Sequence, residues 1–367
     1  MRRCRVNMCM AKMDQQQIRD IMSGRRKGAG AFFHRAALTA VSIPYAAASR
    51  LRRLAFSAGV LPRYSADAPV ICVGNITTGG TGKTPMVAWL VRQLRQMGRR
   101  PAVLTRGYKS RGGISDEAEL LKKMLICTAG RSPAGEWSTP VIVNPDRLAG
   151  AARAVAAGAD VLVMDDGFQH LRLRRDLDIV LIDATRPFGF GHCLPRGLLR
   201  EPLAALKCAG AIVITRADGV TKIEMDTLRT RLRQLAPNAI QCSAVNRPTA
   251  LIDETGKSLS PSTLAGRKIL AFCGLGNPDQ FFATLSRLKA DIRSAVPLAD
   301  HAAYDPSDID RLASQAARCG AEAMVTTAKD RVKLPTKAAA IPTWTLIIDV
   351  EAIEGHDDLL DLIKKRI

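Results

Sequence analysis

Aromatic residues are scarce in this sequence, at 4% of 367 residues, whereas hydrophobic residues together reach 47%. The core must therefore be mainly aliphatic, and the chain is long enough to form two domains. Proteins that bind single-stranded nucleic acid use aromatic side chains as stacking platforms. The composition argues against that role, and we expect no nucleic-acid partner.

Cysteine pairs are also missing, because the nine cysteines are scattered and none belongs to a C-x-x-C motif. Cys72 and Cys273 lie inside apolar runs that are typical of buried strands. The cysteines therefore predict no metal cluster and favour a reducing compartment.

Acidic residues are outnumbered: 34 Asp and Glu residues accompany 54 Lys and Arg residues, for a formal net charge of +20. A balance this basic indicates an anionic partner, such as nucleic acid, an acidic membrane surface or a phosphorylated substrate. Part of the excess also serves ordinary solubility.

No apolar run is long enough to cross a membrane. The most apolar stretch near the N-terminus is 31–48, and its uninterrupted part, 36–48, is too short for ~30 Å of hydrocarbon. Pro44 predicts a kink in this helix. Arginines follow at positions 50, 52, 53 and 63. This pattern suits a helix that lies in an anionic membrane surface, and it suits equally a helix packed on the protein's own core. Residues 31–64 are therefore expected to contain a helix, and both interpretations stay open at this point.

The preceding residues, 1–30, are basic and polar and lack the periodicity of a core element. They fit either a disordered extension or an over-long start, and they do not resemble a signal peptide.

Residues 70–85 contain the segment around which the chain is organised. Val70–Val73 predicts a buried parallel strand, and the glycines that follow permit a tight turn whose N–H groups point into one concavity. Lys83 supplies a charge for β- and γ-phosphates, and the Thr84 hydroxyl suits Mg²⁺. The helical spacing from Met86 onward places a helix N-terminus at the phosphates. The residues assigned to ATP binding are Thr77, Thr78, Gly79, Gly80, Thr81, Gly82, Lys83 and Thr84.

The motif departs from the usual G-x-x-x-x-G-K-[ST] pattern, because its first glycine would fall at Thr77. The alternative is a glycine-rich turn with a chance Lys-Thr pair. The order of strand, turn and helix favours the phosphate loop.

Apolar runs alternate with helical segments after this loop, which predicts a parallel sheet covered by helices on both faces. We assign 65–219 to a P-loop core domain. From about residue 220 the pattern of apolar runs and turn residues changes. We expect 241–251 to be irregular and 220–367 to form a smaller α/β domain.

Two acids, Asp165 and Asp166, end the apolar run that begins at Val161. A strand that ends in acids is the arrangement that holds Mg²⁺, directly or through water, although an acidic turn gives the same pattern. The basic loop with Arg106 and Lys109 follows another predicted strand. Asp116 comes next, and it suits either a base for an acceptor hydroxyl or a helix N-cap.

Together these motifs resemble the tetraacyldisaccharide 4'-kinase family. The string Asp165–His170, with the letters DDGFQH, is the most specific piece, and the altered phosphate loop is this family's variant. The other matching segments are Gly74–Thr77, Gly79–Pro85, Arg106–Tyr108, Asp116–Glu117, Pro145–Arg147, Leu194–Pro195, Leu199–Pro202, Phe272–Phe282, Asp300–His301 and Thr326–Asp330.

The resemblance implies an ATP- and Mg²⁺-dependent kinase for the 4'-hydroxyl of a tetraacylated glucosamine disaccharide 1-phosphate. It also implies work at the cytoplasmic face of the bacterial inner membrane, with an acylated lipid substrate and an anionic membrane surface as partners. It further implies two α/β domains, of which 65–219 is the P-loop kinase core, and an N-terminal membrane-associated helix within 31–64. The residues carried over are Asp116, His301 and Lys83 for catalysis; Thr84, Asp165, Asp166 and Glu201 for the metal; and Arg106, Lys109, Arg147, His170 and Arg200 for the substrate.

A GTPase-type switch or metallochaperone is the alternative. Thr215–Asp218 echoes the guanine-reading Asn/Thr-Lys-x-Asp motif, but Arg216 departs from it. No Cys/His cluster supports metal delivery. The sequence determines no oligomeric state, and a monomer is consistent with it.

Overall fold

The computed structural model describes residues 20–107, 116–127, 137–275, 278–298, 304–334 and 341–367. Twelve strands of this described part form one sheet, in the order β10-β9-β11-β12-β7-β6-β5-β1-β4-β2-β3, with β8 paired to β7. The strand bounds are β1 (Val70–Asn75), β2 (Pro101–Thr105), β3 (Val141–Val143), β4 (Val161–Asp165), β5 (Leu177–Asp183), β6 (Ala211–Thr215), β7 (Ile240–Ile252), β8 (Ser258–Leu259), β9 (Lys268–Cys273), β10 (Asp291–Pro297), β11 (Ala323–Thr327) and β12 (Thr343–Glu354).

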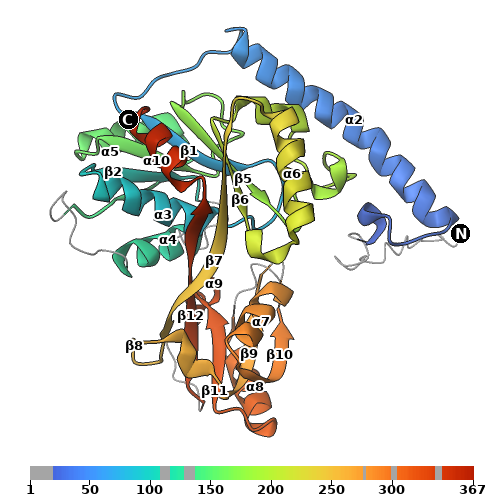
Figure 1. Cartoon of the computed structure of the whole chain (residues 1–367), viewed down its shortest axis with the longest axis vertical. Helices are drawn as coiled ribbons and strands as arrows, with labels where there is room; N and C mark the ends of the chain where they lie inside the picture. Colours follow the sequence, from blue (N-terminus) through green and yellow to red (C-terminus); the bar gives the residue numbers. More distant parts are fainter. Residues whose placement is uncertain (1–19, 108–115, 128–136, 276–277, 299–303, 335–340) are drawn as a thin grey trace, which may run out of the picture.

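The strand pairings are parallel except those of β7 with β12 and with β8. Helices lie on both sides of the sheet (Figure 1). They are α2 (Ala29–Ser57), α3 (Lys83–Gln96), α4 (Asp116–Cys127), α5 (Arg147–Ala156), α6 (Lys222–Leu235), α7 (Pro278–Arg287), α8 (Pro306–Arg318), α9 (Ala328–Arg331) and α10 (His356–Lys364).

Strand β1 shows why the sheet is covered on both faces. Ile71 and Val73 are fully buried in one core with α3, α4 and α10. Val70 and Cys72 point the other way, into a second core with α5 and α6. Because successive strand residues face opposite sides, a strand that is apolar throughout must be buried twice. The predicted parallel sheet with helices on both faces is confirmed.

The expectation of irregular structure over 241–251 is wrong, because these residues lie in β7. The start of β7 pairs with β6 and most of its length pairs with β12, about 100 residues further along the chain, so its main partner is distant in sequence. Pro248 sits opposite Ile348, where the pairing register shifts. A bulge of this kind accommodates a proline within a strand.

The predicted division at residue 220 stays a prediction. The sheet runs across it without interruption, since β6 pairs with β7. The chain also returns to the first half at its end, where Leu359 and Ile363 of α10 are buried in the core shared with α3. Arg92 of α3 and Asp349 of β12 form an ion pair at 2.6 Å.

Helix α2 runs through Pro44 as one element and lies along the outside of the half of the protein that contains β1 and α3 (Figure 1). One face of the helix turns inward, with partly or fully buried residues at positions 31, 35, 38, 39, 42, 46, 49, 53 and 56. This spacing of three or four residues is that of one helix face. Ser42 Oγ donates to the carbonyl oxygen of Cys193 at 2.9 Å, so the helix is docked on the protein.

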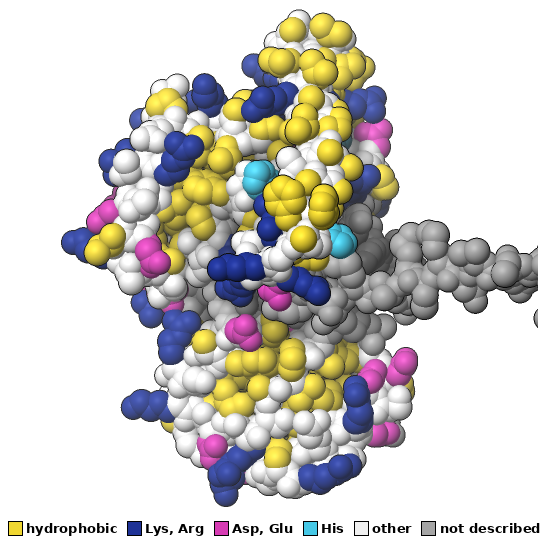
Figure 2. All heavy atoms as spheres, turned by 90° about the vertical axis from the view of Figure 1, so that its right-hand side faces the viewer, with side chains coloured by type: hydrophobic (Ala, Val, Ile, Leu, Met, Phe, Trp, Pro, Cys, Tyr) yellow, Lys and Arg dark blue, Asp and Glu magenta, His cyan; other side chains and the backbone are white. Residues whose placement is uncertain are grey.

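The opposite face of α2 exposes large hydrophobic side chains, and Figure 2 shows them gathered over the upper half of the molecule with lysine and arginine beside them. They are Phe32, Phe33, Val41, Ile43, Leu51 and Leu54. Among the described residues, no helix is long and apolar enough to cross a membrane. The interpretation of a helix packed on the protein's own core is therefore correct for the inner face, and membrane association of the outer face stays a prediction.

The last part of the predicted extension, from residue 20 onward, also contacts the body of the protein. Ile21 is buried, and the carbonyl oxygen of Met22 accepts a hydrogen bond from Arg196 at 2.6 Å. Residues 1–19 lie outside the described part.

Candidate active site

The turn between β1 and α3 has the backbone of a phosphate loop. Gly79 and Gly82 have φ values of 120° and 87°, a region that strongly favours glycine. Gly82 directly precedes α3, whose first residues are Lys83 and Thr84. The free N–H groups of the helix N-terminus therefore face the place where phosphates bind.

Thr77 replaces the first glycine of the usual pattern without strain, because it is not among the residues with positive φ. It is buried and forms a β-bridge with Leu199. The next residue, Thr78, donates its N–H to the carbonyl oxygen of Leu198 at 2.7 Å. The first part of the loop is thus paired with an extended segment, which explains why a side chain is tolerated there.

Residues at the ends of β1 and β6, two strands separated by β5 in the sheet, hold the second part of the loop. Asn75, the last residue of β1, donates its Nδ2 to Thr81 Oγ1 at 2.9 Å. Thr215, the last residue of β6, donates its hydroxyl to the carbonyl oxygen of Thr81 at 3.1 Å. Arg216 follows and donates to the carbonyl oxygen of Gly80 at 2.6 Å. Sequence reasoning assigned no role in the loop to these three residues.

The acid at the end of β4 meets two positive charges. Lys83 Nζ lies 3.6 Å from Asp166 Oδ1, and Arg200 Nη1 lies 2.9 Å from both carboxylate oxygens. Burial raises the pKa of Asp166, but the charges of Lys83 and Arg200 outweigh burial and lower the pKa below its ordinary value. Asp166 is therefore ionised at neutral pH beside the phosphate loop.

Asp165 is buried immediately before it, and its carbonyl oxygen accepts a hydrogen bond from Arg147 at 3.5 Å. Arg147 opens α5 and also donates to the carbonyl oxygen of Asn144 at 2.9 Å. Burial lowers the pKa of Arg147 more than the Asp165 carboxylate raises it, and the charge of Arg106 lowers it further. Arg147 and Arg106 thus share the carboxyl edge of the sheet with the acids.

His170 closes the acid-containing loop and is held as a neutral ring. Burial lowers its pKa from 6.5 to about 4, and the positive charges of Arg147, Arg175 and Arg52 lower it as well. Its Nε2 is buried and has no hydrogen-bond partner in the described part of the chain. A neutral imidazole in this position can offer one hydrogen bond to a substrate group.

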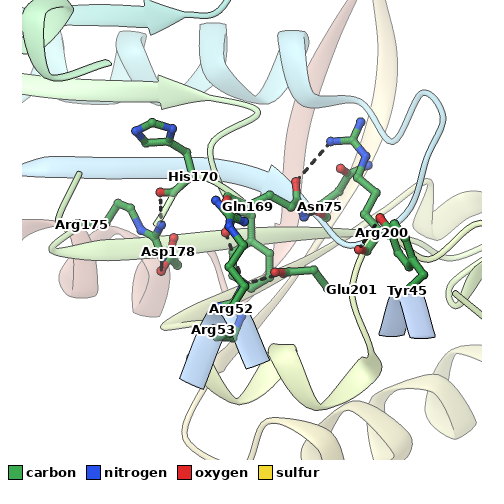
Figure 3. Close-up of polar contacts among 11 residues, drawn as sticks. Tyr45, Arg52, Arg53, Asn75, Gln169, His170, Arg175, Asp178, Arg200 and Glu201 are labelled. Carbon is green, nitrogen blue, oxygen red and sulfur yellow. Dashed lines mark hydrogen bonds and ion pairs between the residues drawn. The ribbon is translucent and has the colours of Figure 1, made fainter. Parts of the chain in front are cut away.

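Glu201 has a partner that the sequence did not suggest. Its carboxylate lies 2.5 Å from the guanidinium of Arg53 on α2, and both side chains are largely buried (Figure 3). Its predicted metal role stays a prediction, since its nearest cation in the structure is this arginine. No local signal connects two residues that are 148 positions apart.

Three of the predicted site residues cannot be placed. Lys109 and His301 lie outside the described residues. Asp116 is the first residue of α4, but its side chain is outside the described part. The proposed base therefore begins a helix.

Mg²⁺ fits the donor set at this edge. The described residues contain no group of three or more His, Cys, Asp or Glu that could enclose a metal. Mg²⁺ in kinases is held by one or two carboxylates together with substrate phosphates and a hydroxyl. Asp165, Asp166 and Thr84 supply these oxygens at the ends of β4 and the phosphate loop.

The structure gives both key residues of the guanine-reading alternative other partners. Asp218, which would have to accept hydrogen bonds from guanine, is ion-paired with Arg287 of α7 at 2.5 Å. Arg216 contacts the phosphate loop and the Asp183 carboxylate.

Comparison with known proteins gives a consistent answer. The profile of the family described as Tetraacyldisaccharide-1-P 4'-kinase (LpxK) matches residues 34–367. Tetraacyldisaccharide 4'-kinase of Geobacter sulfurreducens is 36% identical over 347 residues, which cover 92% of this chain and 95% of the relative. The protein of the same name from Syntrophus aciditrophicus is 41% identical over 303 residues, with 77% and 79% covered.

One solved structure is similar over nearly its whole length. It is the crystal structure of the "apo" form of LpxK from Aquifex aeolicus in complex with ATP, with a TM-score of 0.67 and 25% sequence identity. The match covers 90% of this chain and 98% of that one. On the family profile and these relatives, the chain belongs to the tetraacyldisaccharide-1-phosphate 4'-kinase family.

Proposed function

We propose that this chain transfers the γ-phosphate of ATP to the 4'-hydroxyl of a tetraacylated glucosamine disaccharide 1-phosphate, a step of lipid A biosynthesis. The observation that carries the proposal is the cluster of Lys83, Asp166 and Arg200 at the phosphate loop of a chain from this family. The relatives bear the same activity in their names.

The site suits phosphoryl transfer because that reaction needs positioning and charge neutralisation more than covalent chemistry. Lys83 and the N-terminus of α3 would bind the triphosphate of ATP, and Arg200 adds a second cation next to Asp166. Mg²⁺, when bound by Asp165, Asp166 or Thr84, neutralises charge on the phosphates. Asp166 also holds Lys83 in place before ATP arrives.

Asp116 is the proposed base for the acceptor hydroxyl, with His301 as the partner that tunes it. The family motif supports both roles. An Asp116→Ala variant should lose about 10²-fold or more in kcat with ATP binding nearly intact. If His301 acts with Asp116, the double variant should lose less than the sum of the two barriers.

The acceptor is proposed to lie at the edge lined by Arg106, Arg147 and His170, with Lys109 on the same basic loop. The cations there suit the phosphate that the acceptor already carries. Neutralising Arg106 should then raise KM for the lipid more than KM for ATP.

The exposed apolar face of α2 is proposed to lie in an anionic membrane surface. Large hydrophobic side chains next to arginines are the combination that such a surface binds. In a bacterium that makes lipid A, this would be the cytoplasmic face of the inner membrane.

The experiment that tests the function supplies the purified chain with ATP, Mg²⁺ and a panel of acceptors in detergent. The panel holds the tetraacylated disaccharide 1-phosphate, its unacylated counterpart and free glucosamine. We expect one added phosphate on the first alone. Lys83→Ala is the inactive control, with kcat lowered roughly 10²–10³-fold. Equal phosphorylation of the unacylated sugar would remove the lipid requirement, and a preference for GTP would favour a switch protein.

A further inference from the structure

Helix α2 contacts two loops, one carrying Asp166 and the other carrying Arg200, on the side away from the phosphate loop. Arg52 donates to the carbonyl oxygen of Gln169 at 3.0 Å. Arg53 donates to the carbonyl oxygen of Phe168 at 3.4 Å, and its guanidinium carbon lies 4.7 Å from the centre of that ring. These contacts hold the loop that carries Asp166.

The same helix holds the segment that carries Arg200. Tyr45 donates its hydroxyl to the carbonyl oxygen of Arg200 at 3.0 Å. Arg53 is ion-paired at 2.5 Å with Glu201, whose exposed fraction is only 3%. Figure 3 shows Arg52 and Arg53 rising from α2 between Gln169 and Glu201. Separating a largely buried ion pair would leave the Glu201 charge unpaired, so the pair holds the two segments together.

The other sides of these two loops face the nucleotide-binding segment. The N–H of Arg200 donates to the carbonyl oxygen of Ile76 at 2.7 Å, and Gln169 Nε2 donates to that of Asn75 at 2.9 Å. Arg200 Nη1 also lies 3.3 Å from Gln169 Oε1. The two loops are therefore enclosed between α2 and the phosphate loop, with little freedom to shift.

We infer that Arg53 is a positioning residue for phosphoryl transfer, which holds Arg200 and Asp166 in register through Glu201 and Phe168. This inference rests on the proposed kinase function. It makes α2 part of the catalytic apparatus and not only a means of attachment. In this proposal the inner face of α2 supports the reaction with or without a membrane, and the outer face binds the membrane surface.

The test measures kinetics in detergent micelles, where membrane attachment plays no part. Displacing a catalytic group by ~1 Å can cost about 10²-fold in rate. We therefore expect Arg53→Met to lower kcat about 10- to 100-fold, with KM for ATP changed less than threefold. Arg53→Lys keeps one cation opposite Glu201 and should recover part of the lost kcat. The Arg53→Met and Arg200→Met losses should be non-additive, because both act on Asp166.

Controls separate this role from simple loss of stability or of charge. Arg247→Ala removes an arginine from another ion pair with a glutamate, at 2.6 Å from Glu351 on the exposed surface, and should leave kcat unchanged. Because Arg53→Met leaves Glu201 buried alone, the Arg53→Met, Glu201→Met double variant keeps the site free of an unpaired charge. It should unfold near the temperature of the natural protein and still show the lower kcat.

Two results would overturn the inference: unchanged kcat in Arg53→Met, or full recovery of kcat in the double variant. The proposed function fails separately, if the natural protein adds no phosphate to the lipid acceptor. Binding of a non-hydrolysable ATP analogue reports on the nucleotide site in either case, and we expect Arg53→Met to keep that affinity.

Discussion

Arg200 and Asp166 stand 34 positions apart in the sequence and meet at 2.9 Å, with Arg200 Nη1 bonded to both oxygens of the carboxylate. Asp166 adopts a positive φ of 50°, a left-handed conformation that is uncommon outside glycine and that aspartate accepts more readily than most residues. Its carboxylate also faces Lys83, so one acid connects the end of β4 with the phosphate loop.

This relationship leads to a prediction about pH. The Lys83 and Arg200 charges lower the pKa of Asp166 against the opposing effect of burial. The Arg200→Gln variant removes one of the two charges that lower the pKa of Asp166 and leaves the effect of burial unchanged, so this pKa should rise. Activity that needs the ionised acid is lost as pH falls through this pKa. The acidic limb of the kcat profile should therefore move to higher pH, as measured by initial rates in constant ionic strength. An unmoved limb would mean that another group controls it.

A second prediction concerns Arg216, which combines a left-handed backbone with two contacts to the nucleotide site. Its guanidinium donates to the Gly80 carbonyl oxygen at 2.6 Å and is ion-paired with Asp183, and both side chains are nearly buried. We expect Arg216→Ala to raise KM for ATP about tenfold or more, because the loop loses one of its supports. KM for the lipid should stay unchanged.

Lysine at this position can make only one of the two contacts, so Arg216→Lys should be intermediate. Loss of the buried partner also leaves Asp183 unpaired, so thermal unfolding must first show that the variants are folded. An equal rise of both KM values would point to a general loss of structure instead.

The phosphate loop was predictable because its determinants are local. Gly79, Gly82 and Lys83 lie within five residues, between an apolar strand and a helical pattern, and all of them take the expected places. The acid strand was predictable for the same reason. Arg200 was predicted as a site residue only through the resemblance to a family, because no short sequence pattern indicates it.

What could not be predicted depends on partners far along the chain. Strand β7 contains Pro248 and several polar residues, and it is a strand because β6 and β12 offer it backbone partners on both sides. The metal role of Glu201 stays a prediction, but its ion pair with Arg53, 148 positions away, could not be predicted from local sequence. For α2, amphipathic spacing is visible in the sequence, but which face packs inward depends on the surface that receives it.

His170 gives a third prediction, on stability. Its pKa in the folded protein is about 4 against 6.5 ordinarily, because of burial and then the charges of Arg147, Arg175 and Arg52. Between these two values the unfolded chain binds more protons, so the free energy of unfolding falls as pH drops through that window. The full stability contribution is present above 6.5.

His170→Gln removes the titrating group and should flatten that part of the dependence. The ring is only half buried, so after allowance for solvent screening we expect a difference of about 1–2 kcal/mol between neutral pH and pH ~4.5. Urea unfolding at the two pH values measures it. A ring that titrates near its ordinary value in NMR spectra would contradict the prediction.

The last prediction concerns the outer face of α2. Leu51 and Leu54 are 65% and 61% exposed, one helical turn apart, on the side that does not touch the core. A fully buried leucine gains roughly 1.5–3 kcal/mol on leaving water. Replacing both with serine should therefore weaken binding to phosphatidylglycerol vesicles by about tenfold or more, and higher salt should weaken it further through the arginines. Sedimentation with vesicles measures both effects.

The matched control is Ile353→Ser on β12, which removes an exposed hydrophobic side chain from a strand that is not part of α2. It should bind vesicles as the natural protein does. A truncation that begins near Ser65 is less informative, because it also uncovers the core under Ala31 and Ser42 and takes Arg53 from Glu201. If the double serine variant sediments as before, the membrane-binding surface lies elsewhere on the protein.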